Sequence, residues 1–171
     1  MNVVQEKDPY SDTALVEDCQ NGNPAAFDEL VRRYKDRVYN VVYRFLGNHE
    51  DAQDVAQETF IKAYLGIRQF EGRSRVYTWL YSIAGNLARN KIRDGGRRGR
   101  DKSVSLDAKR DDGSTREWAS DAETPEQSAR AREMESVLQN ALNELPEHYR
   151  LVFVLRTLEN LSYDEIADAA G

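Results

Sequence analysis

The stretch that decides the fold is residues 74–93, SRVYTWLYSIAGNLARNKIR. Its apolar residues recur at three- and four-residue steps, the period of a helix that packs one side on a core; they are Val76, Leu80, Ile83, Ala84, Leu87 and Ala88. Another side collects hydroxyl, amide and guanidinium groups, from Thr78, Ser82, Asn86, Arg89, Asn90 and Arg93. The stretch therefore predicts an amphipathic helix whose polar side is rich in hydrogen-bond donors.

Two interpretations of this helix stay open on its residues alone. Amides and guanidinium groups match phosphates and base edges, and aromatic rings near the helix start can stack on unpaired bases. A dense basic run follows, made of Arg89, Lys91, Arg93, Arg97, Arg98, Arg100 and Lys102. Against this, a charged stripe is often only a solvated face, and aromatic residues at helical spacing usually belong to the core. We favour the core for Trp79, and an anionic partner and an ordinary solvated surface are the two alternatives for the polar side.

Composition limits what such a helix can do. The 171 residues include 30 acidic and 24 basic side chains, a net charge of −6, so long-range attraction to DNA is weak. DNA contact must then rely on a local patch or on a larger partner. The single cysteine, Cys19, excludes an internal disulfide. No apolar run approaches the ~20 residues that span a bilayer, and residues 1–10 lack a signal-peptide core. We expect a soluble, cytoplasmic protein without direct membrane insertion.

Nearly every regular segment predicts a helix, so the expected fold class is all-α. Ser11, Asn23 followed by Pro24, and Asn48 are each suited to cap a helix start. Apolar stripes follow these caps, and the predicted core side of the helix after Asn48 is Ala52, Val55, Ala56, Thr59, Phe60, Ala63, Tyr64 and Ile67. These segments and residues 74–93 would form a first helical domain over residues 1–94.

A flexible linker is expected over residues 95–124, because this interval lacks apolar periodicity and cannot offset chain entropy. Gly95, Gly96 and Gly99 predict that the preceding helix ends inside the basic run. Order returns at Thr124 and Pro125, and residues 162–165 form a capping box. A second small helical domain would therefore occupy residues 125–171, with Gly171 where a helix-turn-helix would turn.

An acidic ridge lies beside the apolar stripe of the helix after Asn48. Asp51, Asp54 and Glu58 follow at helical steps, with Gln57 nearby. Three interpretations compete: a solvated face, a docking ridge for a basic partner, and a metal site. A metal or catalytic site would need acidic groups from a second element, and no such motif is present. We therefore predict no catalytic residue, no metal site and no cofactor, and a protein that is not an enzyme.

Several motifs together resemble a known family. They are DAQDVAQETFIKAY at residues 51–64, Phe70-x-Gly72-x-Ser74, TWLYxIAxN at residues 78–86, Leu145-Pro146-Glu147 and LSYDEIA at residues 161–167. In this order, with a variable linker between the two ordered parts, they resemble the extracytoplasmic-function group of bacterial RNA polymerase sigma factors. The resemblance implies sigma domain two, a flexible linker and an incomplete sigma domain four.

The resemblance also implies partners and site residues. The acidic helix would dock on the clamp helices of the polymerase largest subunit through Asp51, Asp54, Gln57 and Glu58, and the second domain would meet the beta flap. The loop 70–75 would capture a flipped base of the minus-ten promoter element, and the next helix would hold neighbouring bases and phosphates. The implied DNA-binding set is Phe70, Gly72, Arg73, Ser74, Arg75, Thr78, Asn86, Arg89, Asn90, Arg93 and Arg97. An anti-sigma factor is a further implied partner.

One departure from the family pattern concerns the end of the chain. Family members continue past the position of Gly171 into a helix that contacts the minus-thirty-five element, and those contacts are not carried over here. The expected function is that of a sigma factor that directs RNA polymerase to promoters and melts the minus-ten element. The alternative is a sigma mimic that binds an anti-sigma factor without directing transcription.

Overall fold

The computed structural model describes residues 11–101 and 125–170, and the regular elements within these ranges are all helical. They are α1 (Asp12–Gln20), α2 (Pro24–Leu46), α3 (His49–Gly66), a short 3-10 helix η1 (Ile67–Gln69), α4 (Val76–Asp101), α5 (Pro125–Glu144), α6 (Glu147–Leu158) and α7 (Tyr163–Ala170). The predicted all-α class is confirmed.

Side-chain caps start the first three helices where the sequence predicts them. The Ser11 hydroxyl oxygen accepts from the amide of Ala14 at 3.2 Å, and the Asn48 side-chain oxygen accepts from the amide of Asp51 at 2.9 Å. Asn23 caps α2 in the same way, with Pro24 at the first helical position. These bonds satisfy amides that have no partner within the helix.

Helix α4 runs further than its glycines predict. It continues through Gly95, Gly96 and Gly99 to Asp101, so the expectation of a helix end inside the basic run was wrong. Each glycine disfavours a helix by only about 1 kcal/mol relative to alanine. The first part of α4 is held by the core, and elongation from a formed helix adds one hydrogen bond per residue. The remainder of the predicted linker, residues 102–124, lies outside the described residues.

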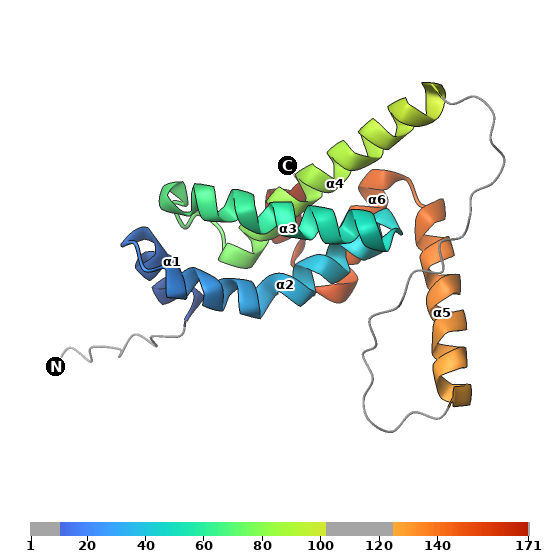
Figure 1. The fold of residues 1–171 in the computed structure, drawn as a ribbon, viewed down its shortest axis with the longest axis horizontal. Helices are drawn as coiled ribbons and strands as arrows, with labels where there is room; N and C mark the ends of the chain where they lie inside the picture. Colours follow the sequence, from blue (N-terminus) through green and yellow to red (C-terminus); the bar gives the residue numbers. More distant parts are fainter. Residues whose placement is uncertain (1–10, 102–124, 171) are drawn as a thin grey trace.

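The first four helices form a compact bundle. Helices α2 and α3 lie side by side as an antiparallel pair, joined by a short turn at Gly47 (Figure 1). Gly47 adopts a left-handed conformation with φ of 73°, which favours glycine, and its amide donates to the carbonyl of Tyr43. Helix α4 packs against both α2 and α3, and α1 packs on α2.

The C-terminal helices pack on this bundle. Helix α6 lies against α2, α7 lies against α4, and α5 contacts the end of α2 (Figure 1). Gly85 on α4 permits a close approach, because a β-carbon there would lie 3.3 Å from Cδ2 of Leu151. Buried residues of α6 and α7, such as Val154 and Ile166, join those of the first four helices in one hydrophobic cluster.

Candidate nucleic-acid interface

The polar side of α4 presents two arginine–asparagine pairs one helical turn apart. Arg89 Nη2 donates to Asn86 Oδ1 at 2.7 Å, and Arg93 Nη2 donates to Asn90 Oδ1 at 2.7 Å. Asn86, Asn90 and Arg93 are exposed, and Arg89 is partly exposed. The structure thus brings four predicted DNA-binding residues together in one row of amide and guanidinium groups.

Thr78 and Arg97 are the two other predicted DNA-binding residues on α4. Thr78 is buried, with 1% of its surface exposed, and its hydroxyl has no hydrogen-bond partner among the described residues. It therefore lies in the protein interior and not on the solvent-exposed row. Arg97 falls in the last part of α4, where the structure describes only the helical backbone.

The predicted base-capture loop, residues 70–75, joins η1 to α4. Phe70 lies against Trp79 with ring centroids 4.8 Å apart and an interplanar angle of 38°, so both rings are partly buried as the core interpretation of Trp79 expects. Gly72 has φ of 70°, a conformation that side chains with a β-carbon rarely adopt. Arg73 is exposed and pairs with Glu71 at 2.6 Å.

A cavity of about 740 Å³ lies beneath this loop. The whole loop 70–75 lines it, together with the start of α4, and α1 forms another wall with Asp12, Thr13, Val16, Glu17 and Gln20. Glu165 and Asp168 of α7 also line it. Six of the predicted DNA-binding residues, the five in the loop and Thr78, therefore line one concave surface, which is a common geometry for a bound ligand.

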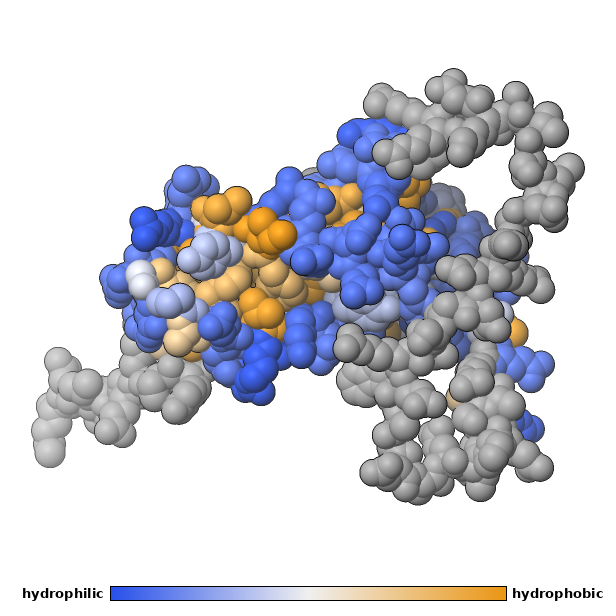
Figure 2. Space-filling model, in the orientation of Figure 1, coloured by the Kyte–Doolittle hydropathy of each residue, from blue (hydrophilic) through white to orange (hydrophobic). Residues whose placement is uncertain are grey.

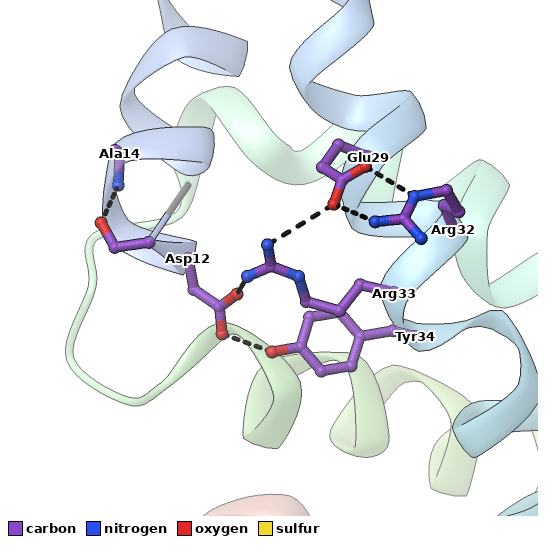
Figure 3. Close-up of polar contacts among 7 residues, drawn as sticks. Asp12, Ala14, Glu29, Arg32, Arg33 and Tyr34 are labelled. Atoms are coloured by element: carbon purple, nitrogen blue, oxygen red, sulfur yellow. Dashed lines mark hydrogen bonds and ion pairs between the residues drawn. The ribbon is translucent and has the colours of Figure 1, made fainter. Parts of the chain in front are cut away.

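A polar cluster fixes α1 beside this cavity (Figure 3). Asp12 accepts hydrogen bonds from Arg33 Nη1 and from the Tyr34 hydroxyl. Burial raises the pKa of Tyr34 above its ordinary value, and the bond to Asp12 adds to this shift. On the neighbouring turn of α2, Glu29 pairs with Arg32 at 2.7 Å. Sequence reasoning assigned no role to α1, because these contacts join residues far apart in the chain.

Helix α7 engages part of the predicted DNA-binding surface. Arg89 Nη1 donates to the backbone carbonyl of Ala170 at 2.7 Å, and the Tyr77 hydroxyl donates to Glu165 Oε1 at 2.7 Å. Arg75 Nε lies 3.9 Å from the same carboxylate. Hydrogen bonds from the Ser162 backbone and the Tyr77 hydroxyl lower the pKa of Glu165. In this arrangement the loop and the first turns of α4 are partly covered by α7.

The acidic ridge on α3 also has an intramolecular partner. Lys91 of α4 lies 2.9 Å from Asp51 and 3.2 Å from Asp54, and these hydrogen bonds raise the pKa of Lys91. Glu58 pairs only weakly with Lys62 one turn along, at 3.5 Å, and Gln57 is exposed. Three carboxylates against two lysines, Lys91 and the weakly paired Lys62, leave the ridge with an excess of negative charge.

An apolar groove lies next to the ridge, and sequence reasoning missed it. Figure 2 shows apolar side chains gathered on this face over α2 and α3. The lining residues are Phe27, Val31, Gln57, Phe60, Ile61, Tyr64 and Leu65. Ile61 is 54% exposed and Leu65 is 72% exposed.

Tyr64 was predicted to lie in the core, and this was wrong, because the residue is 54% exposed, although its ring makes a T-shaped contact with Phe27. The signal for the groove was available in the sequence: Ile61 and Leu65 stand one turn apart and outside the core stripe.

Within the described residues no group of three or more metal-binding side chains comes together. Nor does any described helix combine the length and the apolar character that crossing a membrane requires.

Comparison with known families gives two matches along the chain. The family model of sigma-70 region 2 matches residues 30–98, and that of sigma-70 region 4 matches residues 136–171. The first match includes the ridge, the loop and the described polar row of α4. The second begins within α5 and includes α6 and α7.

Similar proteins match over most of the chain. The RNA polymerase sigma-H factor of Pseudomonas aeruginosa is 41% identical over 157 residues, which cover 91% of this chain and 80% of that protein. The ECF RNA polymerase sigma-E factor of Haemophilus influenzae is 40% identical, with 92% and 82% covered. The ECF sigma factor SigW of Bacillus subtilis is 34% identical, with 90% and 81% covered.

A solved structure has the same fold. The structure of CnrH in complex with the cytosolic domain of CnrY matches with a TM-score of 0.65 at 23% identity, covering 92% of this chain and 81% of that one. The motifs, the two family regions and the relatives agree, and the chain belongs to the extracytoplasmic-function group of bacterial RNA polymerase sigma factors, which direct the polymerase to promoters.

Proposed function

We propose that this sigma factor opens the minus-ten element of its promoters with the polar row of α4 and the loop 70–75. The observation that carries the proposal is the row itself: two arginine–asparagine pairs, Arg89–Asn86 and Arg93–Asn90, stand one turn apart on the helix whose start lines the cavity together with the loop. Arginines hold phosphates, and asparagine amides form paired hydrogen bonds with base edges.

The cavity under the loop is the proposed place for an extruded base. The loop 70–75 and α1 form most of its lining, and the exposed Arg73 and Arg75 can hold the adjoining phosphates. Flipping a base out of a duplex costs a few kcal/mol. A chain with net charge −6 has little electrostatic attraction to supply this energy. The complete polymerase must contribute it.

Contact with DNA requires a rearrangement of the chain. Arg89, Tyr77 and Arg75 are engaged by α7, so α7 has to leave α4 before these groups can meet a promoter. We therefore propose that residues 1–94 and 125–171 act as two units and that residues 95–124 connect them. The separated C-terminal unit would then meet the beta flap of the polymerase.

The ridge is the proposed docking site for the clamp helices of the polymerase largest subunit. Asp54 and Glu58 are exposed and negative, Gln57 is exposed between them, and the apolar groove begins at Gln57. A basic partner helix with apolar residues on one face would satisfy both features. The groove would supply buried apolar area, and the carboxylates would supply orientation.

The proposal also includes where the protein acts and how it is regulated. The protein would act in the cytoplasm without catalysing a reaction itself, and an anti-sigma factor would control it. CnrH, which shares the fold, is bound to the cytosolic domain of CnrY in its solved structure.

Run-off transcription tests the proposal against a sigma mimic. Purified core polymerase with this chain should produce promoter-specific transcripts, with permanganate-reactive thymines in the minus-ten element. A complex that binds core polymerase but gives no transcript and no open region on any promoter from the source genome would contradict the sigma role and favour the mimic.

A further inference from the structure

Helix α1 lies before residue 30, where the region 2 match begins, and yet it forms a wall of the cavity under the loop. Its last residue is Gln20, which is partly buried. Gln20 Nε2 donates to two backbone carbonyls, of Ile67 at 3.0 Å and of Phe70 at 2.8 Å. One amide group thus uses both of its N–H donors on the segment that leads into the loop.

These two carbonyls lie where the chain passes from α3 through η1 into the loop. Ile67 begins η1 directly after α3, and Phe70 follows the end of η1, where helix carbonyls commonly lack partners within the helix. The carbonyl of Ile67 also accepts from the amide of Phe70 at 3.2 Å. At its far end the loop is tied into α4, since the amide of Trp79 donates to the carbonyl of Arg75 at 3.1 Å. The course of the loop is therefore set at Phe70 and at Arg75.

The bond to Phe70 also bears on the shape of the cavity. The orientation of its peptide group sets where the side chain leaves the backbone, and the Phe70 ring lies against Trp79. Release of this carbonyl would free the peptide group to rotate and would move the ring at the cavity edge. A recognition site retains its selectivity only while its groups are held in place by a supporting layer.

The position of α1 allows Gln20 to hold the backbone at the start of the loop. Asp12 ties the start of α1 to Arg33 and Tyr34 of α2 (Figure 3), and Leu15, Val16 and Cys19 are buried in the core. The amide of Gln20 thus extends from a helix that is held at its other end. A rigid support transmits a fixed position to the loop, whereas a solvent-exposed glutamine would not.

We propose that Gln20 is a positioning residue for base selection: its two hydrogen bonds hold the loop 70–75 in the shape that selects the captured minus-ten base. The inference rests on the proposed function of the loop. Gln20 itself does not touch the base in this proposal, and its effect passes through the backbone of Ile67 and Phe70.

Three variants of the full chain test this role. Gln20→Met has a similar size but no donor, Gln20→Lys restores a donor, and Gln53→Met makes the same replacement at an exposed site on α3. The first measurement is hydrogen–deuterium exchange of the peptide that contains residues 67–75 in the free protein. Exchange should rise in Gln20→Met and stay near wild type in Gln20→Lys and Gln53→Met.

The second measurement is promoter opening by reconstituted holoenzyme, on templates that differ in one base of the minus-ten element. The preference for the best base over the others should fall by about tenfold in Gln20→Met, the order of discrimination that base contacts provide. It should be retained in Gln20→Lys and Gln53→Met. The wild type and the three variants should bind core polymerase with equal affinity. A variant that failed to fold would lose this binding.

The outcomes separate the inference from the function it rests on. Unchanged loop exchange in Gln20→Met overturns the positioning role, whatever the promoters show. Raised exchange with an unchanged base preference overturns the role in selection. If Gln20→Met loses core binding through misfolding, a further variant without the donor, Gln20→Glu, takes its place beside Gln20→Lys in the same two measurements. A wild-type holoenzyme that opens no promoter contradicts the proposed function, and loop exchange then still decides whether Gln20 anchors the loop.

Discussion

Arg37 on α2 and Glu159 after α6 are 122 residues apart and form an ion pair in which Nε and Nη2 lie 2.9 and 2.5 Å from one carboxylate oxygen. The side chain of Glu159 is only 5% exposed, whereas that of Arg37 is 46% exposed. Beside them, Tyr81 of α4 is buried, and burial raises its pKa, with Glu159 adding to the shift. The pair joins the C-terminal helices to the first four.

Replacing this carboxylate should loosen that junction. Glu159→Gln keeps the shape and removes the charge, and the free energy of unfolding should fall by about 1–2 kcal/mol. This is less than the 3–5 kcal/mol expected for a fully buried pair, because the guanidinium of Arg37 can regain water. Urea denaturation measures the change, and Asp164→Asn, an exposed carboxylate on α7, should leave stability unaltered.

Loosening α7 should uncover the DNA-binding surface. The double variant Glu159→Gln/Glu165→Gln weakens contacts to Arg37, Arg75 and Tyr77 without altering any residue of α4. Fluorescence anisotropy should show the free protein binding a single-stranded minus-ten oligonucleotide about tenfold more tightly, which corresponds to ~1.4 kcal/mol. Asp164→Asn serves as the control for charge alone. Equal affinity of the double variant and this control would refute the masking of α4 by α7.

Acid should weaken the contribution of Glu165. Its pKa is lowered, first by the hydrogen bond from the Ser162 backbone and then by that from Tyr77. A lowered pKa in the folded state adds stability above the ordinary glutamate value of about 4.3, and this stability is lost as pH falls through the folded value. The difference in unfolding free energy between wild type and Glu165→Gln should therefore be larger at pH 7 than at pH 3. A difference independent of pH would contradict the assignment.

A charge-swap experiment tests polymerase docking by the ridge. Reversal of Asp51 and Asp54 to lysine also places cations against Lys91, so the addition of Lys91→Glu restores the internal pairing with opposite polarity. The triple variant should keep its fold, and its affinity for core polymerase should still fall by about tenfold or more, because the partner meets reversed charges. Lys91→Met alone should leave core binding intact. Wild-type affinity of the triple variant would exclude the ridge as the docking surface.

Phosphate contact by Arg93 should be visible in the salt dependence of promoter binding. Arg93→Ala should weaken holoenzyme complexes on all promoters alike and reduce the slope of log affinity against log salt by about 1, since one phosphate contact releases roughly one counterion. Lys35→Ala, an exposed cation on α2, is the matched control. An unchanged slope would remove Arg93 from the DNA-binding surface.

Local signals in the sequence were sufficient to predict the helices and which residues share the polar row of α4. Caps such as Ser11 and Asn48, and apolar residues at helical steps, act within a few residues, and the structure confirms them. The row of Asn86, Arg89, Asn90 and Arg93 follows from the same periodicity. The helix end predicted from the glycines of α4 was wrong, because a local preference of about 1 kcal/mol each does not end a helix that is already formed.

The sequence by itself therefore determined the fold class, the helix starts and the residues that share a face, because these depend on spacing and on local hydrogen bonds. Only the tertiary structure decided which faces meet. It placed Lys91 against the ridge, α7 over the loop and α4, Tyr64 at the surface, and the amide of Gln20 on the carbonyls of Ile67 and Phe70. Such contacts join residues that lie up to 122 positions apart, as in Arg37 and Glu159. Their partners are chosen by packing and burial across the whole chain, for which local spacing carries no signal.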